Sequence, residues 1–193
     1  LTRYVLLSHL ENYIAHFPHV RITISCQSTY QTLHLLDEEK IDLGLIGRPQ
    51  KLRGYYFHPL LKIRDTFVCT RQYLENQKKL YPDEPLIQAA TFMMLDEDNI
   101  TRQTVNAQLK EHHVELSHIL EVTTMDLLIQ FAEIGLGIAC VIRDFVKKEL
   151  EEGTLVEVPV GFSFPPREIG FVCRQKDANL DLIVPFFGDG QGN

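Results

Sequence analysis

Residues 20–47 read VRITISCQSTYQTLHLLDEEKIDLGLIG, and this stretch sets the order of the first elements. The run Val20–Ile24 alternates apolar and polar side chains, which is typical of a strand with one covered face. A helical run follows from Tyr30 to Lys40. The next run, Ile41–Gly47, is almost entirely apolar, as expected of a strand covered on both faces. The stretch therefore predicts a strand, a polar turn, a helix and a second strand.

The polar turn Cys26–Thr29 lies at the carboxyl end of the first predicted strand and at the start of the helix. The N–H groups of a first helical turn lack intrahelical partners, and the helix dipole favours negative charge there. The side chains of Gln27, Ser28 and Thr29 are therefore suited either to capping the helix or to binding a small polar ligand. The residue types leave both interpretations open.

The rest of the chain continues this alternation of helices and strands. The segment Leu6–Phe17 carries one apolar face and predicts a first helix. Polar turns after predicted strands recur at Asp96–Thr101 and Thr123–Asp126. We therefore expect an α/β fold with mainly parallel sheets. Further predicted strands are 55–64, 66–70, 91–95, 119–122, 138–142, 155–160 and 169–174, and further predicted helices are 72–80, 102–113, 127–134, 144–151 and 180–187.

Composition narrows the class of protein. The net charge is −7 and the basic residues are scattered, so this stretch is a poor nucleic-acid binder by itself. The longest apolar runs are too short to cross a membrane, and no export signal opens the chain. The cysteines Cys26, Cys69, Cys140 and Cys173 are widely spaced, as expected of reduced, buried thiols in a cytoplasmic protein. Cys26 is either a small buried residue or a thiol activated by the helix N-terminus.

Signatures of metal binding and of catalysis are absent from the sequence. His16 and His19 straddle a helix end, and neither an HExxH motif nor Cys/His ligand spacing occurs. GxSxG, P-loop and GxGxxG motifs are also missing. We therefore expect no metal, no cofactor and no catalytic residues.

Several segments resemble the effector-binding domain of LysR-type transcriptional regulators. In the first half they are Phe17–Ile22, Ser28-Thr29 and Ile41–Pro49. In the second half, Glu121–Leu127 is followed by Gly135–Ala139. The order and spacing of these segments carry the resemblance, which extends over almost the whole chain.

The resemblance implies a periplasmic-binding-protein-like α/β fold of two Rossmann-like lobes with an inter-lobe cleft. Lobe I would comprise residues 1–65 and 167–193, and lobe II residues 66–166. Crossing segments near 64–67 and 165–169 would form the hinge. The first strand of lobe I and the helix-turn-helix domain that binds DNA are expected to be missing upstream of Leu1.

The resemblance also implies a set of effector contacts. A polar loop after the missing strand would end at Thr2, and Gly47 departs from relatives that carry a polar side chain at that position. For Arg48, the residue type alone suits either a ligand carboxylate or a solvated loop. The implied ligand-binding residues are Thr2, Gln27, Ser28, Thr29, Gly47, Arg48, Asn99, Ile100, Thr101 and Thr123.

The function expected from this resemblance is sensing of a small polar or anionic metabolite, which would shift the population of lobe arrangements. The family also implies a homodimer or tetramer that contacts DNA only through the missing domain. We expect no membrane partner and no enzymatic activity. Two alternatives share the fold: a solute-binding protein for transport and a two-lobed α/β enzyme. The residues do not identify the effector.

Overall fold

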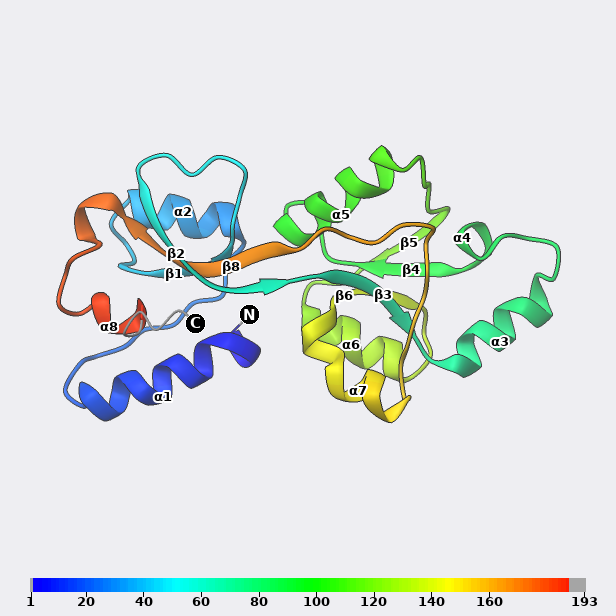
Figure 1. The fold of residues 1–193 in the computed structure, drawn as a ribbon, viewed down its shortest axis with the longest axis horizontal. Coiled ribbons are helices and arrows are strands. Elements are labelled where there is room, and N and C mark those ends of the chain that lie inside the picture. The colour runs from blue at the N-terminus through cyan, green and yellow to red at the C-terminus, as the bar shows by residue number, and fades with distance from the viewer. Residues whose placement is uncertain (1, 188–193) are drawn as a thin grey trace. The chain divides into compact units, whose positions relative to one another are not determined.

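The computed structural model describes residues 2–187, apart from the side chain of Thr2 (Figure 1). The chain divides into two compact units: unit 1 combines the residues up to Lys62 with those from Arg167 onward, and unit 2 is Ile63–Pro166. The first boundary between the units follows Lys62, whereas the sequence-based boundary of lobe I follows residue 65. The second boundary lies between residues 166 and 167 in the structure and in the prediction. The identity of these units with the functional lobes, and the position of the hinge, remain predictions.

Unit 1 contains a three-stranded sheet with the order β1-β8-β2. Strands β1 and β8 are antiparallel, with Gly44 opposite Val172 and Gly47 opposite Ile169. The expectation of mainly parallel sheets is therefore wrong for this pair. The elements of unit 1 are η1 (Thr2–Leu6), α1 (Leu7–His16), α2 (Thr29–Asp37), β1 (Gly44–Gly47), β2 (Tyr55–Ile63), β8 (Arg167–Arg174), η3 (Gln175–Asp177) and α8 (Val184–Phe187).

Different helices cover the two faces of this sheet. Val172 of β8 packs with Leu36 of α2 and Ile46 of β1. The neighbouring Phe171 meets the ring of His9 from α1 edge-on, with 5.1 Å between ring centroids. Successive side chains of a strand point to opposite faces. Helices α1 and α2 therefore lie on opposite sides of the sheet (Figure 1).

Helix α2 approaches β1 closely at Gly44. A Cβ atom at this glycine would lie 2.4 Å from Cγ2 of Thr32, so any side chain would force Thr32 to move. The hydroxyl of Tyr55 on β2 also donates a hydrogen bond of 3.2 Å to the carbonyl oxygen of Leu33. These contacts hold α2, and with it the polar turn that precedes it, against the sheet of unit 1.

The prediction of a strand at Val20–Ile24 is wrong. These residues precede α2 without joining a ladder with any strand in the described part of the chain. Ile22 and Ile24 are 36% and 51% exposed. Alternating side chains favour a strand, but a strand also needs a neighbour that accepts and donates its backbone hydrogen bonds. The sheet of unit 1 provides none beside this segment among residues 2–187.

Unit 2 contains a five-stranded sheet with the order β5-β4-β6-β3-β7. Strand β4 is parallel to both β5 and β6, whereas β3 is antiparallel to β6 and to β7. The parallel prediction therefore holds for the three strands at one side of this sheet. The elements are β3 (Asp65–Cys69), α3 (Arg71–Leu80), α4 (Leu86–Ala89), β4 (Thr91–Met94), α5 (Ile100–Glu111), β5 (His118–Glu121), α6 (Met125–Glu133), β6 (Ile138–Ile142), η2 (Arg143–Val146), α7 (Lys147–Glu152) and β7 (Val156–Glu157).

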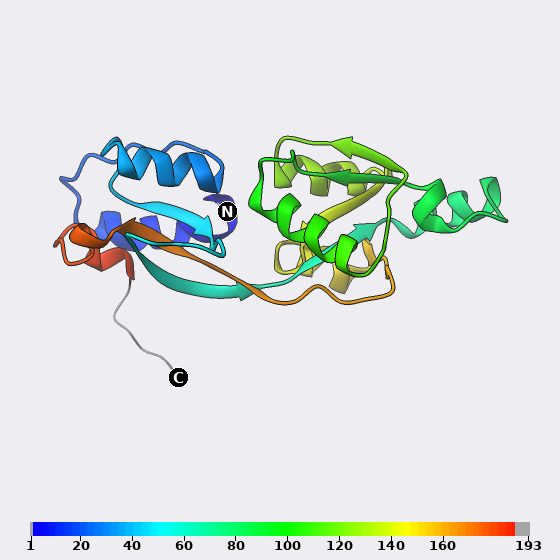
Figure 2. The same cartoon turned by 90° about the horizontal axis from the view of Figure 1, so that it is seen from above.

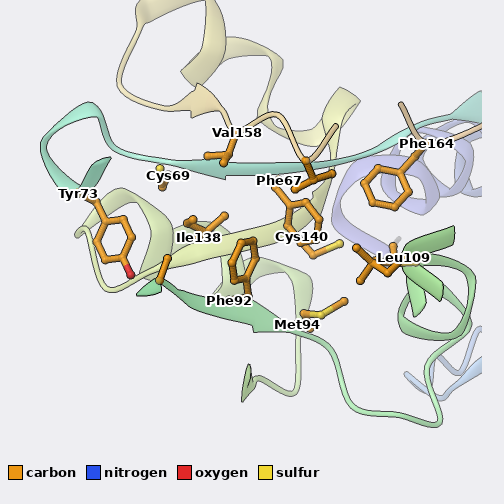
Figure 3. Packing of buried hydrophobic residues seen from close by; sticks show 13 residues of the cluster. Phe67, Cys69, Tyr73, Phe92, Met94, Leu109, Ile138, Cys140, Val158 and Phe164 are labelled. Atoms are coloured by element: carbon orange, nitrogen blue, oxygen red, sulfur yellow. The ribbon is translucent and has the colours of Figure 1, made fainter. Parts of the chain in front are cut away.

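Aromatic side chains fill the core of unit 2. Figure 3 shows Phe67, Phe92 and Phe164 meeting beside Met94 and Cys140. The ring of Phe67 packs edge-on against Phe92, with centroids 5.2 Å apart, and against Phe164 at 5.7 Å. Such edge-to-face pairs add about 0.5–1.5 kcal/mol each beyond the burial of apolar area. This packed core gives the loops at the strand ends a rigid base.

The cysteines follow their predicted environment at three of four positions. Cys69, Cys140 and Cys173 are buried, and burial raises the pKa of the Cys69 thiol to about 12. Cys26 is exposed, so its interpretation as a small buried residue is wrong. It lies in the segment before α2, which joins no strand ladder in the described part of the chain.

Helices α5 and α6 lie on opposite faces of the unit 2 sheet (Figures 1 and 2). Helix α5 connects β4 to the edge strand β5, and α6 returns from β5 across β4 to β6. Crossovers between parallel strands are right-handed, so connections that run in opposite directions place their helices on opposite faces. Helix α5 begins after the carboxyl end of β4, and helix α6 begins after the carboxyl end of its parallel neighbour β5.

Proline explains why two of the predicted elements are shorter than expected. The strand predicted at 155–160 is only β7, because Pro159 has no N–H group to continue the ladder. The helix predicted at 180–187 begins only at Val184, since Pro185 cannot donate to the carbonyl of residue 181. Gly153 adopts a left-handed φ of 75° directly after α7, a conformation in which helices commonly end and which glycine adopts without strain.

Candidate functional site

The first polar turn of unit 1 forms a complete capping box on α2. The backbone N–H of Gln31 donates to Oγ of Ser28 at 3.3 Å, and the N–H of Ser28 donates to Oε1 of Gln31 at 3.2 Å. The hydroxyl of Thr32 donates to the carbonyl oxygen of Ser28 at 2.9 Å. Capping, one of the two interpretations of this turn, is therefore present. Within the described residues the Ser28 hydroxyl accepts this bond and donates none, so its proton can still reach a ligand.

The neighbours of Ser28 differ in access to solvent. Thr29 is buried, with 7% of its surface exposed, whereas Gln27 is exposed. The N–H groups of Thr29 and Tyr30 belong to the first turn of α2 and have no partner within the helix. The donors available at this turn are therefore the Ser28 hydroxyl, two backbone amides and the exposed amide of Gln27.

At the end of β1, Gly47 is buried and Arg48 is held by a neighbour. Nη1 of Arg48 lies 2.5 Å from Oε2 of Glu168, and the N–H of Arg48 donates to the carbonyl oxygen of Glu168 at 2.9 Å. The guanidinium also lies over the ring of Phe57, 5.3 Å from its centroid. Arg48 is half exposed, but it is not a freely solvated loop arginine. A ligand carboxylate would have to compete with Glu168 for it.

In unit 2, Asn99 caps helix α5. Its Oδ1 accepts a hydrogen bond of 2.9 Å from the N–H of Thr101, and its carbonyl oxygen accepts one of 3.0 Å from Gln103. Thr101 is buried and Ile100 is partly buried. Asn99, Ile100 and Thr101 thus form one compact turn at the carboxyl end of β4.

The turn after β5 carries two adjacent threonines. Thr124 rather than Thr123 is the N-cap of α6, and its Oγ1 accepts from the N–H of Leu127 at 3.3 Å. Thr123 is exposed. Two adjacent threonines give the same local signal, so the sequence alone did not distinguish the cap from its neighbour.

One buried charge in this region escaped the sequence reasoning. Arg102 of α5 is 4% exposed. Its Nη1 donates to the carbonyl oxygen of Leu95 at 2.9 Å, and its Nε donates to Oδ1 of Asn106 at 3.1 Å. Carboxylates of Glu121 and Glu97 lie 3.5 and 3.9 Å from its guanidinium. An arginine in the first turn of a helix opposes the helix dipole, and this was the available signal.

The predicted residues thus gather into separate groups. In unit 1, Ser28 and Thr29 lie on the helix that packs on β1, the strand that ends in Gly47. In unit 2, the cap at Asn99 and the turn at Thr123 follow the parallel neighbours β4 and β5. The side chain of Thr2 lies outside what the structure describes.

A surface pocket of about 440 Å³ lies elsewhere in unit 2, between α5 and β5. It contains none of the predicted ligand-binding residues. Its walls are mainly the carboxyl half of the helix, the loop after it and the edge strand. The lining residues are Asn106, Leu109, Lys110, His113, Val114, Glu115, Leu116 and Ile119.

Two further classes of site are absent from residues 2–187. Clusters of three or more His, Cys, Asp or Glu side chains suited to a metal ion do not occur among them. None of the described helices combines the length and the apolar character needed to span a membrane.

Comparison with known proteins agrees with this geometry. The family described as "LysR substrate binding domain" matches residues 1–186. The uncharacterized HTH-type transcriptional regulator YeiE of Escherichia coli K12 is 22% identical over 168 residues, which cover 81% of this chain and 53% of YeiE. The chain therefore spans about half the length of this relative.

Solved structures share the fold at low sequence identity. The regulatory domain of OxyR2 from Vibrio vulnificus (C206S mutant) has a TM-score of 0.70 and 19% identity, covering 96% of this chain and 90% of that one. The regulatory domain of CcmR from Synechocystis PCC6803, in complex with 2-PG, has a TM-score of 0.71 and 17% identity, with 90% and 83% covered. With a family match over almost all of its residues and this two-unit α/β fold, the chain belongs to the LysR substrate-binding domain family.

Proposed function

We propose that this chain is the effector-sensing part of a LysR-type transcriptional regulator and binds a small polar or anionic metabolite. The family match over residues 1–186 carries the proposal. The related YeiE is named as a transcriptional regulator, and the similar CcmR domain holds 2-PG. Sensing would be a population shift, in which the effector favours the arrangement that it binds more tightly.

We propose that the effector contacts polar turns of both units, at the N-terminus of α2 and at the carboxyl ends of β1, β4 and β5. In unit 1 these are Gln27–Thr29 and Gly47-Arg48, and in unit 2 they are Asn99–Thr101 and Thr123. The ends of strands in α/β sheets are the usual binding positions in this class of fold. The donors at Ser28 and at the first turn of α2 support a ligand with an acceptor or negative group.

Binding measurements on variants of the 193-residue chain test this site. Succinate, citrate, glutamate, inorganic phosphate and 2-PG form the panel, screened by thermal shift and then by calorimetry. Ser28→Ala combined with Thr29→Ala should weaken the tightest compound about tenfold or more, because a hydrogen bond to a charged group stabilises by about 1.5–3 kcal/mol. Asn99→Ala should weaken the same compound.

Thr70→Ala is the matched control for this experiment. Thr70 caps α3 as Ser28 caps α2, with a bond of 3.2 Å from the N–H of Tyr73 to its Oγ1. Both substitutions should lower stability by about 0.5–2 kcal/mol, the usual effect of losing a cap. Only the Ser28 variant should lose affinity. Equal affinity of the two variants for every bound compound would show that the assigned site is wrong.

We also propose that the regulator acts in the cytoplasm as a homodimer or tetramer, and that DNA is bound by another part of the full-length protein. Exposed apolar side chains support self-association: Leu7 and Ile14 on α1 are 56% and 51% exposed. On the edge strand β5, Ile119 and Leu120 are 43% and 39% exposed. Since the curated relative is named as a regulator, we favour this function over transport and over catalysis.

A further inference from the structure

Arg102 occupies a position where its residue type is locally unfavourable. It is the third residue of α5, and a cation in the first turn opposes the positive end of the helix dipole. It is also 4% exposed, and a buried charge is costly unless it is paired and hydrogen-bonded. Conflicts of this kind between local preference and the fold tend to occur at functional positions.

The contacts of Arg102 join the two polar turns of unit 2. Through Nη1 it binds the carbonyl oxygen of Leu95, the residue directly after β4, and it faces the carboxylate of Glu121, the last residue of β5. Through Nη2 it faces Glu97, within the turn that leads to Asn99. The guanidinium of Arg102 therefore contacts residues at the carboxyl ends of both parallel strands, β4 and β5.

The contacts of Arg102 differ in distance and in the exposure of the partner. The bonds to Leu95 and Asn106 are short, at 2.9 and 3.1 Å. The carboxylates of Glu97 and Glu121 lie at 3.9 and 3.5 Å, and their side chains are 79% and 54% exposed. Exposed carboxylates at such distances contribute little to stability, although Arg102 itself is buried. The contacts therefore fix the position of the backbone more than they stabilise the unit as a whole.

We propose that Arg102 is a positioning residue of the effector site, which holds the turns 96–101 and 121–124 in one arrangement. This inference rests on the proposed function, because it assigns those turns to effector binding. Arginine suits the task since its planar fork presents several N–H donors at fixed angles, whereas lysine offers one compact charge. The role is indirect, because Arg102 acts through the turns and is not itself assigned as a ligand contact.

Amide hydrogen exchange tests the positioning role without any ligand. We compare the unaltered chain with Arg102→Met, Arg102→Lys and the control Arg143→Met. Arg143 is also in unit 2 and pairs with Glu157 at 3.1 Å, away from both turns. In Arg102→Met, amides of 96–103 and 121–127 should exchange faster than in the unaltered chain, since the bond to Leu95 and the contacts with Glu97 and Glu121 are lost. Arg102→Lys should lie between the two, and Arg143→Met should leave both turns unchanged.

Affinity for the tightest compound of the panel above provides the second readout. Arg102→Met should lower this affinity, because the turns would occupy the binding-competent arrangement less often, while the melting temperature stays close to that of Arg143→Met. Unchanged exchange in either turn would overturn the proposal, as would faster exchange spread evenly over unit 2, which indicates a purely structural role. If no panel compound binds the unaltered chain, that contradicts the proposed function, and the exchange result alone decides the role of Arg102.

Discussion

At the scale of single residues, the polar side chains of the proposed site serve the fold and leave some capacity for a ligand. Ser28 and Asn99 each accept a bond from a helical N–H, as caps do throughout proteins. Arg48 is bound to Glu168, so it is less available to a ligand than its position suggested. The groups of unit 1 that can still bind a ligand are mainly hydrogen-bond donors, namely the Ser28 hydroxyl and the N–H groups of the first turn of α2. Such donors fit a ligand acceptor or an anion better than a cation.

Another residue with a readable consequence is His9 of α1. Burial, and then the nearby His58, lower the pKa of His9 below its usual value of 6.5. Its ring packs edge-on against Phe171, and the ring of His58 stacks on Phe187 with centroids 4.9 Å apart. A proton on His9 is therefore bound more weakly in the folded chain than in the unfolded chain.

This difference predicts a loss of stability in acid. The unfolded state binds the proton first, so stability contributed by His9 is present above pH 6.5 and is lost as the pH falls through 6.5 toward the lower folded pKa. The slope can reach at most about 1.4 kcal/mol per pH unit, the limit for one proton. Thermal unfolding of His9→Gln should change less between pH 8 and pH 5 than unfolding of the unaltered chain. The same dependence in His9→Gln and in the exposed control His19→Gln would contradict this assignment.

At the scale of elements, local signals in the sequence were reliable and long-range ones were not. The apolar strands β4 and β6 depend on neighbours in sequence, and these predictions are confirmed. Capping by Ser28 is also local, and it was one of the two interpretations that the residue types left open. The segment Val20–Ile24 was predicted as a strand because its pattern is local, whereas strand pairing is not. Arg102 was missed for the same reason, since its partners include Glu121, nineteen residues away along the chain.

The exposed faces of two elements predict how copies of the chain associate. Ile14→Asp on α1 and Ile119→Asp on β5 should each weaken the dimer at least tenfold in sedimentation equilibrium, because a charge would be buried without a partner. Leu80→Asp is the control, as Leu80 is 68% exposed at the end of α3. If the unaltered chain sediments as a monomer, or if the control weakens association equally, these faces are not the interface.

At the scale of the whole molecule, the chain forms two units that it connects twice, once at Lys62/Ile63 and once at Pro166/Arg167. Each unit has its own packed core. The identity of the effector did not follow from the sequence, because caps and ligand contacts use the same residue types at helix N-termini. A ligand could shift the population of arrangements only by its difference in affinity between them.

The most direct test of effector sensing is a titration of the ¹⁵N-labelled chain with the tightest compound of the panel, followed by amide chemical shifts. The account predicts that the largest shifts occur at 27–31 in unit 1 and at 99–103 in unit 2, both saturating at the affinity measured by calorimetry. Shifts confined to the residues around the pocket between α5 and β5, such as Leu109 and Leu116, would contradict it. So would a spectrum that none of the compounds changes.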